Sequence, residues 1–488
     1  MIDLTLNEKQ IEKNAALCAR QGIVLPTYAQ MANPETIPEE IQEELQGIGT
    51  DEVHSRNLFR VTWENEPRRD GGTYDGVNYM VMPKELTGVD ARIIGLVGKW
   101  FPTGAHKVGA AYSCLAPTLV TGQFDPEKNM AVWPSTGNYC RGGAYISRLL
   151  ACRSVAILPE EMSKERFRWL EKMADETIAT PGCESNVKEI FDKCHELTAE
   201  RGDKIFIFNQ FAEMGNHLWH HEVTGRAMEK VLNREMGPRD RFAGTCVSSG
   251  SAGTTAAGEY LKEVYPGAKL AVSEALQCPT LLANGFGGHR IEGIGDKHVP
   301  WIHNVKNTDM VVAIDDEHTI RAFRLFNEPA GRAYLKERGI AAEIVDNLDQ
   351  LGISCVCNVM TAIKFAKYYE LTGEDLVITV FTDSEELYTS RLEELNAERG
   401  EYTRDNAIAD FEMIQQLGTD NLLELRYDER KRVHNLKYYT WVEQQGKSIE
   451  EINRQWYDRE YWQQIYATRE PLDELITEFN DRVRLRRR

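Results

Sequence analysis

The chain has 488 residues, of which 42% are hydrophobic and 27% charged, and its formal net charge is −19. This length exceeds what one compact core normally holds, so we expect two domains with extensions. The acidic balance argues against a nucleic-acid partner, and no segment approaches the roughly 20 apolar residues that span a bilayer.

The first residues and the cysteines indicate the cellular compartment of the protein. The first ten residues lack the basic start and apolar run of a signal peptide. Ten cysteines are scattered along the chain, and the pair Cys355 and Cys357 has no second pair to complete a zinc site. We therefore expect free thiols in a cytoplasmic protein.

The chain divides by composition into four parts. Residues 1–85 are predicted to be a leader of helices and loops, and residues 401–488 a charged, helical extension. Trp441, Trp456 and Trp462 are expected to pack this extension onto the body or a second subunit. Between these parts, nine short apolar segments alternate with helical stretches, at 91–97, 129–133, 155–158, 176–179, 205–209, 243–247, 270–273, 310–314 and 376–381. This alternation predicts an α/β fold with two domains of mostly parallel, twisted sheet flanked by helices, over residues 86–235 and 236–400.

Four loops at the ends of predicted strands carry the chemistry. The first is residues 101–107 (Phe-Pro-Thr-Gly-Ala-His-Lys), which place Lys107 between a strand and a helix. At such a turn backbone N–H groups point at a ligand, and a desolvated amine loses its proton readily enough to form a Schiff base.

The second loop is residues 134–143 (Pro-Ser-Thr-Gly-Asn-Tyr-Cys-Arg-Gly-Gly), which opens a helix. Its hydroxyls and free N–H groups suit a substrate carboxylate, although Ser, Thr and Asn also favour a plain N-cap.

The third loop, residues 247–258, is rich in glycine and small hydroxylated residues and precedes a helix expected near Thr255. This pattern suits a phosphate, but its spacing is neither a dinucleotide fingerprint nor a P-loop. A serine hydrolase built on Ser251 is disfavoured, because Ser249 stands where the nucleophile elbow needs a glycine.

The fourth loop, residues 380–384 (Val-Phe-Thr-Asp-Ser), ends the last predicted strand. Its terminal hydroxyl could meet a ring nitrogen at the bottom of a site, or it could be a plain helix cap.

Together and in this order, these segments resemble the cysteine synthase and cystathionine β-synthase branch of the tryptophan-synthase-β-like (fold type II) pyridoxal-phosphate enzymes. Two further segments also resemble segments of this family, at 209–225 (Asn-Gln-Phe to Thr-Gly) and 287–295 (Gly-Gly-His-Arg-Ile-Glu-Gly-Ile-Gly). The resemblance covers roughly residues 85–395. It implies that pyridoxal 5'-phosphate is the cofactor.

The resemblance also implies a role for each matching residue. Lys107 forms the internal aldimine and moves the Cα proton, and Asn138 contacts the phenolic oxygen. Ser384 faces the pyridine nitrogen, provided that alternation sends the neighbouring Asp383 the other way. The remaining residues bind anionic groups, namely the phosphate (Gly250, Ser251, Ala252, Gly253 and Thr254) and the substrate α-carboxylate (Ser135, Thr136 and Gln210).

The implied activity is β-elimination or β-replacement on a small L-amino acid through an aminoacrylate, in an enzyme expected to be a homodimer. A serine at the ring nitrogen makes a milder electron sink than an aspartate, which suits expulsion of a β-substituent. The alternatives are a threonine synthase-like or amino-ketoacid thiolase-like enzyme, and a cofactor-binding subunit without turnover.

Two other features have competing interpretations. Arg141 could favour an acidic group on the substrate, or it could be a surface arginine that caps its helix. His217, His220 and His221 share a helical face, which suggests a metal site. Their spacing is not His-Glu-x-x-His, so a structural role is the favoured interpretation.

Overall fold

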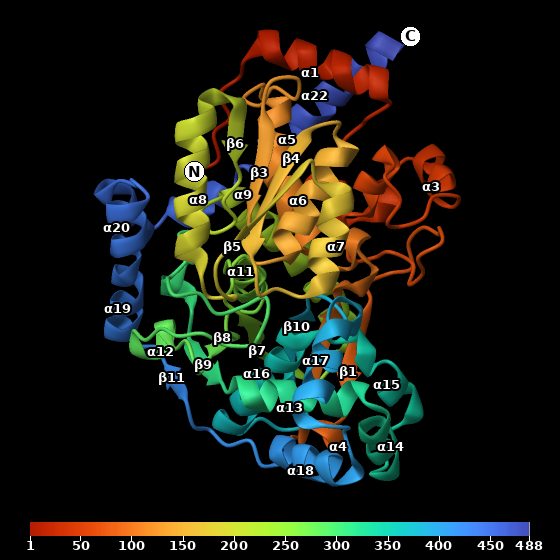
Figure 1. Ribbon diagram of the computed structural model, residues 1–488, viewed down its shortest axis with the longest axis vertical. Coiled ribbons are helices and arrows are strands. Elements are labelled where there is room, and N and C mark those ends of the chain that lie inside the picture. The colour runs from red at the N-terminus through yellow and green to blue at the C-terminus, as the bar shows by residue number, and fades with distance from the viewer. Residues whose placement is uncertain (488) are drawn as a thin grey trace.

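Two sheets organise the molecule, whose computed structural model describes residues 1–487. The larger has seven strands in the order β1-β2-β10-β7-β8-β9-β11, and the smaller has four in the order β5-β4-β3-β6. Figure 1 shows the smaller sheet in the upper half of the molecule and the larger one below it. The strands are β1 Tyr79–Met82, β2 Arg92–Val97, β3 Met130–Pro134, β4 Arg153–Pro159, β5 Glu176–Thr180, β6 Ile205–Ile207, β7 Arg241–Ser248, β8 Lys269–Ala275, β9 Met310–Ile314, β10 Asp375–Phe381 and β11 Leu422–Glu424.

Helices cover both sheets, as the alternating pattern predicts. They are α1 Glu8–Gln21, α2 Tyr28–Ala32, α3 Glu39–Leu45, α4 Lys84–Thr87, α5 Lys107–Val120, α6 Asn138–Leu149, α7 Lys164–Met173, α8 Val187–Arg201, α9 Met214–Trp219, α10 Gly225–Glu235, α11 Thr255–Val264, α12 Thr280–Ala283, α13 Asp316–Asn327, α14 Pro329–Glu337, α15 Ala342–Asp346, α16 Ile353–Tyr368, α17 Thr389–Arg399, α18 Arg404–Gln415, α19 Tyr427–Lys437, α20 Ile449–Tyr457, α21 Tyr461–Tyr466 and α22 Arg469–Arg487.

The predicted α/β class is confirmed, and each of the nine predicted strands is present as β2 to β10. All neighbouring pairs among these strands are parallel. Parallel pairing places the carboxyl ends of the strands at one edge of each sheet, where ligands bind in such folds.

The sequence did not predict β1 and β11. Both are short and pair antiparallel at the two edges of the larger sheet, β1 with β2 and β11 with β9. The leader therefore supplies a strand as well as helices and loops. The predicted domain 86–235 also groups residues 92–97 with β3 to β6, whereas β2 pairs with β10 in the larger sheet. Chain order alone does not decide which sheet a strand joins.

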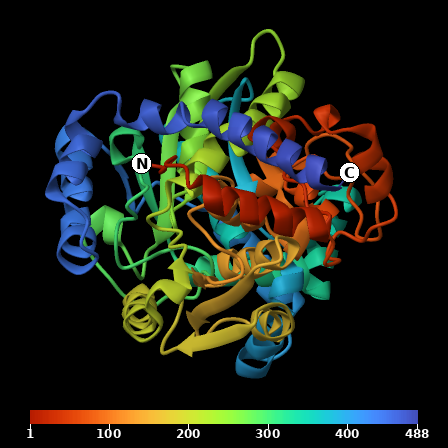
Figure 2. The same ribbon diagram turned by 90° about the horizontal axis from the view of Figure 1, so that it is seen from above.

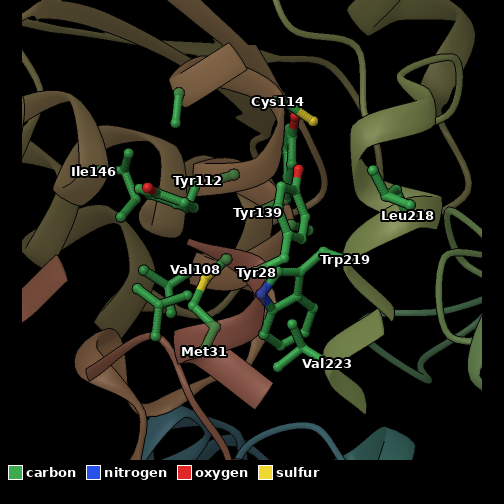
Figure 3. Close-up of a cluster of buried hydrophobic side chains, with 14 of the residues drawn as sticks. Tyr28, Met31, Val108, Tyr112, Cys114, Tyr139, Ile146, Leu218, Trp219 and Val223 are labelled. Carbon is green, nitrogen blue, oxygen red and sulfur yellow. The ribbon is translucent and has the colours of Figure 1, made fainter. Parts of the chain in front are cut away.

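The largest apolar core lies around α5 and draws on segments far apart in sequence. Tyr28 from the leader and Val108 and Tyr112 from α5 meet Trp219 at the end of α9 (Figure 3). The Tyr112 hydroxyl donates to the Pro26 carbonyl oxygen (2.6 Å), which fixes the leader to α5. Lys107 opens the same helix, so this core holds the position of the lysine.

The C-terminal extension packs onto the body, as its aromatic residues predict. Trp441, Trp456 and Trp462 are all buried. The Trp441 indole N–H donates to the Val299 carbonyl oxygen at 2.8 Å. Figure 2 shows α22, in blue, running beside α1, in red, where Arg482 pairs with Glu8.

Membrane-spanning helices and disulfide bonds were considered for residues 1–487, the part that the structure describes. None of their helices has the length and apolar character needed to cross a membrane. Their ten cysteines are all free thiols, and only Cys183 is not fully buried.

Candidate active site

Lys107 is the first residue of α5 and follows a tight turn after β2. Thr103 and Gly104 in that turn adopt positive φ values of 68° and 72°. Burial of the Lys107 amine lowers its pKa to about 8, against the opposing charges of Asp296 and then Glu184. Roughly a tenth of the amine is therefore unprotonated at pH 7, far more than for an exposed lysine, and this form can act as a nucleophile.

The predicted phosphate loop lies directly against this amine. Lys107 Nζ donates to Ser251 Oγ at 3.1 Å, and Asn216 Nδ2 donates to the same oxygen at 3.0 Å. Ala252 holds a positive φ of 62°, and α11 begins at Thr255 as predicted. The chain therefore turns tightly and directs the positive end of a helix toward the lysine.

Close packing explains why residue 253 is a glycine. A Cβ atom there would lie 2.3 Å from Asn216 Oδ1 and 2.8 Å from His220 Cδ2, and both neighbouring side chains are buried. The loop can therefore approach these side chains only because Gly253 has no Cβ.

We predict that Gly253→Ala weakens binding of a phosphorylated ligand. Overpacking costs about 1–3 kcal/mol, which corresponds to roughly 5- to 150-fold in affinity. Fluorescence titration of the apoprotein with pyridoxal phosphate would measure the change. Gly267→Ala is the control, because a Cβ there meets nothing within 4 Å. Equal affinity in both variants would contradict the prediction.

The predicted carboxylate loop assembles at the end of β3. Ser135 Oγ accepts hydrogen bonds from the Gly137 backbone N–H at 3.0 Å and from Gln210 Nε2 at 3.2 Å. The Thr136 hydroxyl hydrogen-bonds to the Glu184 carboxyl group. Ser135, Thr136 and Gln210 are all buried. The structure thus brings together the Ser135 and Gln210 side chains, which lie 75 positions apart in the chain.

Asn138 and Ser384 present polar atoms without a partner. Asn138 Nδ2 donates to Asp383 Oδ2 at 2.6 Å, which leaves Asn138 Oδ1 buried and unpaired. The Ser384 hydroxyl is also buried and unpaired. Asp383 is held instead by Asn138 and by the Tyr388 hydroxyl at 2.7 Å. Unpaired buried polar atoms are costly, so their presence at one site suggests a missing ligand.

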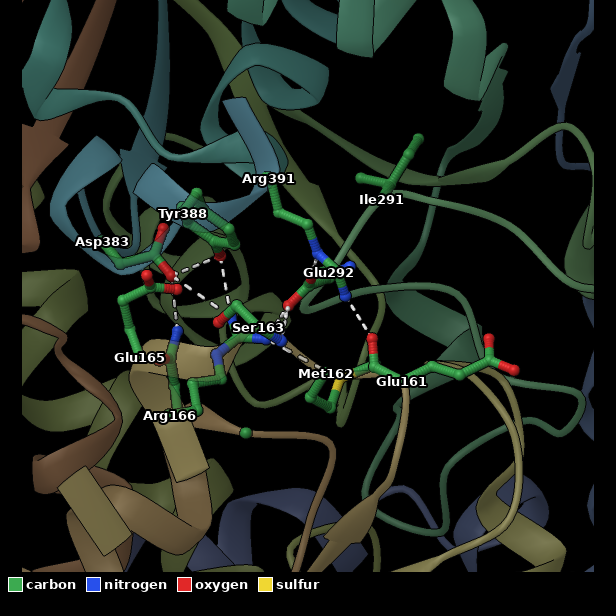
Figure 4. A network of polar contacts seen from close by, with 12 residues as sticks. Glu161, Met162, Ser163, Glu165, Arg166, Ile291, Glu292, Asp383, Tyr388 and Arg391 are labelled. Carbon is green, nitrogen blue, oxygen red and sulfur yellow. Dashed lines mark hydrogen bonds and ion pairs between the residues drawn. The ribbon is translucent and has the colours of Figure 1, made fainter. Parts of the chain in front are cut away.

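Asp383 belongs to a buried network that the sequence did not reveal (Figure 4). Arg166 of α7 pairs with Glu292, and its guanidinium donates to the Tyr388 hydroxyl at 2.8 Å. Burial raises the pKa of Asp383, and the positive charge of Arg166 opposes that rise. The network joins a helix beside the four-stranded sheet to loops of the larger sheet. No motif marks Arg166 or Tyr388 in the sequence.

The three histidines predicted as scaffold have protein partners. His217 Nε2 hydrogen-bonds to the Tyr466 hydroxyl at 3.1 Å, and His220 Nδ1 to Thr224 Oγ1 at 2.9 Å. His221 pairs with Glu222, and its ring stacks on Tyr466 with centroids 3.6 Å apart. Among residues 1–487 no group of His, Cys, Asp and Glu side chains is arranged to hold a metal ion.

Arg141 is not the surface residue that the helix-capping interpretation requires. It is buried, and its guanidinium lies over the Trp169 ring, 4.7 Å from the centroid. The apolar ring replaces part of the hydration that a surface arginine would keep.

The residues described above fit pyridoxal phosphate. The Lys107 amine and the unpaired Ser384 hydroxyl match its aldehyde and ring nitrogen, and the second N–H of the Asn138 amide can donate to its phenolic oxygen. The glycine-rich turn and the start of α11 match its phosphate group.

Comparison with known proteins agrees with this geometry. The sequence profile of the family described as "Pyridoxal-phosphate dependent enzyme" matches residues 100–335. A probable cysteine synthase of Bacillus subtilis is 28% identical over 290 residues, or 59% of this chain and 85% of that protein. Cystathionine beta-synthase of Saccharomyces cerevisiae is 23% identical over 350 residues, or 70% of this chain and 64% of that protein.

Solved structures share the fold at lower identity. A hydrogen sulfide-producing enzyme of Fusobacterium nucleatum has a TM-score of 0.54 at 22% identity, covering 64% of this chain and 95% of that one. A cysteine synthase of Entamoeba histolytica has a TM-score of 0.56 at 20% identity, and the match covers 69% of this chain and 92% of that one. The chain is therefore similar to pyridoxal-phosphate-dependent enzymes of the cysteine synthase and cystathionine β-synthase kind.

Proposed function

We propose that the protein catalyses β-elimination or β-replacement on a small L-amino acid. The observation that carries this proposal is the buried Lys107 amine, which contacts Ser251 of the glycine-rich loop at 3.1 Å and has a pKa of about 8. The named activities of the relatives, cysteine synthase and cystathionine beta-synthase, support the same reaction class.

Pyridoxal phosphate, when bound, supplies an aldehyde that condenses with amines and a ring that withdraws electrons from the substrate Cα. In our proposal Lys107 holds the aldehyde carbon and afterwards takes the proton from Cα. Residues 250–254 hold the phosphate, and Asn138 contacts the phenolic oxygen. The hydrogen bond from Asn138 to Asp383 fixes the orientation of that amide.

Ser135, Thr136 and Gln210 are proposed to bind the substrate α-carboxylate. Ser135 and Thr136 lie just before α6, which adds free backbone N–H groups and the positive end of a helix, and Gln210 reaches Ser135 from the turn after β6. Burial strengthens these interactions, because water competes weakly for the same donors.

The uncharged Ser384 hydroxyl is proposed to face the ring nitrogen. A serine does not hold that nitrogen protonated as a carboxylate would, so electron withdrawal from Cα is milder. This favours rapid loss of a β-substituent over chemistry that needs a long-lived carbanion.

The absorbance spectrum of the purified protein tests this proposal. We expect a visible band from a lysine-bound cofactor, and release of a keto acid or transfer to a nucleophile when L-serine, L-cysteine or O-acetyl-L-serine is added. A protein that stays colourless with added pyridoxal phosphate would refute the proposal. Turnover with none of these amino acids but with a threonine synthase or thiolase substrate would favour the alternative activities.

Two finer expectations remain proposals. We infer that the protein is cytoplasmic, which its free cysteines support, and that it is a homodimer. Light scattering of the purified holoenzyme would give the subunit number.

A further inference from the structure

The C-terminal extension has no part in the mechanism above, yet it contacts the helices that frame the phosphate loop. The loop, residues 250–254, lies between β7 and α11, and Asn216 of α9 bonds to it. Helix α21 of the extension contacts α9. Its last residue is Tyr466, whose side chain is buried at the contact.

The Tyr466 hydroxyl bonds to both α9 and α11. It donates to Glu259 Oε2 of α11 at 2.8 Å, and His217 Nε2 of α9 lies 3.1 Å from the same hydroxyl oxygen. Because the hydroxyl hydrogen goes to the carboxylate, the imidazole N–H is the donor in the second bond. Burial lowers the pKa of His217 well below its ordinary value, so the donating ring is neutral. One hydroxyl therefore bridges the two helices.

Both ends of this bridge lie close to the phosphate loop. His217 follows Asn216, whose Nδ2 donates to Ser251 Oγ at 3.0 Å. Glu259 lies about one helical turn beyond Thr255, where α11 begins and the loop ends. The separation of α9 and α11 therefore determines how Asn216 meets the loop.

The contact between α9 and the loop has no spare room. A Cβ atom at Gly253 would lie 2.3 Å from Asn216 Oδ1, so the two segments already touch. Hydrogen bonds to an anion depend on direction as well as distance. A small shift of α9 relative to α11 would therefore misdirect the donors of residues 250–254.

Within residues 1–487 no other side chain takes the place of the hydroxyl. The nearest charged atoms of the two bridged residues, His217 Nε2 and Glu259 Oε1, are 3.7 Å apart, which is too far for a hydrogen bond. The other ring nitrogen, His217 Nδ1, has no partner. Loss of the hydroxyl would thus leave a buried imidazole N–H unpaired and α9 unconnected to Glu259.

The extension has other attachments that do not involve this hydroxyl. The Tyr466 ring stacks on His221 with centroids 3.6 Å apart, and a phenylalanine ring would keep that contact. Lys437 Nζ donates to the carbonyl oxygens of Trp301 and His303 at 2.9 and 2.6 Å. Tyr466→Phe therefore removes the bridge and leaves the extension in place.

We propose that Tyr466 is a positioning residue of the cofactor site, which ties α9 to α11 and so keeps Asn216 and residues 250–254 in the arrangement that binds the phosphate. It acts through His217 and Glu259. The inference rests on the proposed function, which assigns residues 250–254 to the phosphate. It gives the C-terminal extension a part in cofactor binding.

The test measures how much affinity the phosphate group contributes in each variant. Full-length apoproteins are titrated by fluorescence with pyridoxal phosphate and with pyridoxal, which lacks the phosphate. In Tyr466→Phe the affinity for pyridoxal phosphate should fall roughly 10-fold, the effect of about one buried hydrogen bond. The affinity for pyridoxal should be nearly unchanged, because the lysine and the ring contacts remain.

Tyr461 supplies a matched control on the same helix. Its side chain is buried, and its hydroxyl donates to Glu451 Oε1 of α20 at 3.0 Å, inside the extension. Tyr461→Phe also loses a hydrogen bond to a carboxylate but keeps the bridge between α9 and α11. We expect wild-type affinity for both ligands in this variant.

A second variant breaks the bridge from its other end. His217→Leu removes the N–H donor but leaves the bond from Tyr466 to Glu259, and it should show the same phosphate-specific loss. In both bridge variants the phosphorus NMR resonance of the bound cofactor should shift. Amide hydrogen exchange of the apoproteins should be faster in α9 and residues 250–259. Tyr461→Phe should show neither change.

The outcomes separate this inference from the proposed function. Wild-type affinity for pyridoxal phosphate in Tyr466→Phe would overturn the inference. An equal loss for pyridoxal, or an equal loss in Tyr461→Phe, would also overturn it, because each would show a general loosening of the extension. Wild-type protein that binds pyridoxal as tightly as pyridoxal phosphate would refute the phosphate assignment itself, and the inference with it.

Discussion

Replacing Lys107 by alanine should abolish turnover and the visible absorbance band of the cofactor. The lysine is the group proposed to hold the aldehyde carbon and to move the Cα proton, so its loss removes two functions at once. Loss of a proton-transfer group alone lowers rates by about 10²–10⁴-fold, and we expect at least about 10³-fold here. Stopped-flow absorbance and keto-acid release would measure both effects.

Chemical rescue distinguishes this role from misfolding. A small primary amine such as methylamine should restore part of the turnover in Lys107→Ala, because it can reach the vacated space and accept the proton. Lys84→Ala is the control, since Lys84 lies on the surface with 66% of its side chain exposed. Full activity in Lys107→Ala would contradict the role assigned to this residue.

Replacing Arg166 by methionine should destabilise the protein strongly. The Arg166 side chain is 1% exposed and pairs with Glu292, which is 5% exposed. Removing Arg166 leaves the buried Glu292 with only the half-buried Arg391 as a charged partner, and breaking a buried ion pair typically costs about 3–5 kcal/mol. The same guanidinium supports Tyr388, which in turn donates to Asp383. Urea denaturation followed by fluorescence would measure the free energy of unfolding.

Helix α7 supplies a matched control for this change. Arg168 lies two residues further along the same helix and is exposed, so Arg168→Met should change stability by less than about 0.5 kcal/mol. A double variant, Arg166→Met with Glu292→Gln, should lose less stability than the sum of the single changes, because the carboxylate that lost its fully buried partner is also removed. Strict additivity would show that the two residues do not interact.

The sequence predicted most of the fold because buried parallel strands have a clear signature. Segments such as 310–314 are short, wholly apolar and followed by helices, and β9 coincides with that range. The edge strand β11 lacks the signature, since its residues Leu422–Glu424 are only half-buried and lie in a charged segment. Edge strands depend on a neighbour from elsewhere in the chain, which local sequence does not encode.

The site was predictable where a turn or glycine pattern marks it. Lys107 and Ser251 come from two separate loops, and the structure brings them to 3.1 Å. Asp383 was noticed only as the neighbour of Ser384. Arg166 and Tyr388 carry no pattern, because their importance comes from a buried hydrogen bond between elements 222 positions apart in the chain. Such groups are found from distances and unpaired atoms and not from spacing.

The contact between α1 and α22 has a consequence for the order of folding during synthesis. Arg482 of α22 pairs with Glu8 and Glu12 of α1, and Asn480 hydrogen-bonds to both backbone groups of Leu25. Helix α22, which is synthesised more than 400 residues after α1, thus covers a face of it. Until that happens the apolar face of α1 lacks its cover, so a nascent or prematurely terminated chain exposes it to aggregation and to proteases.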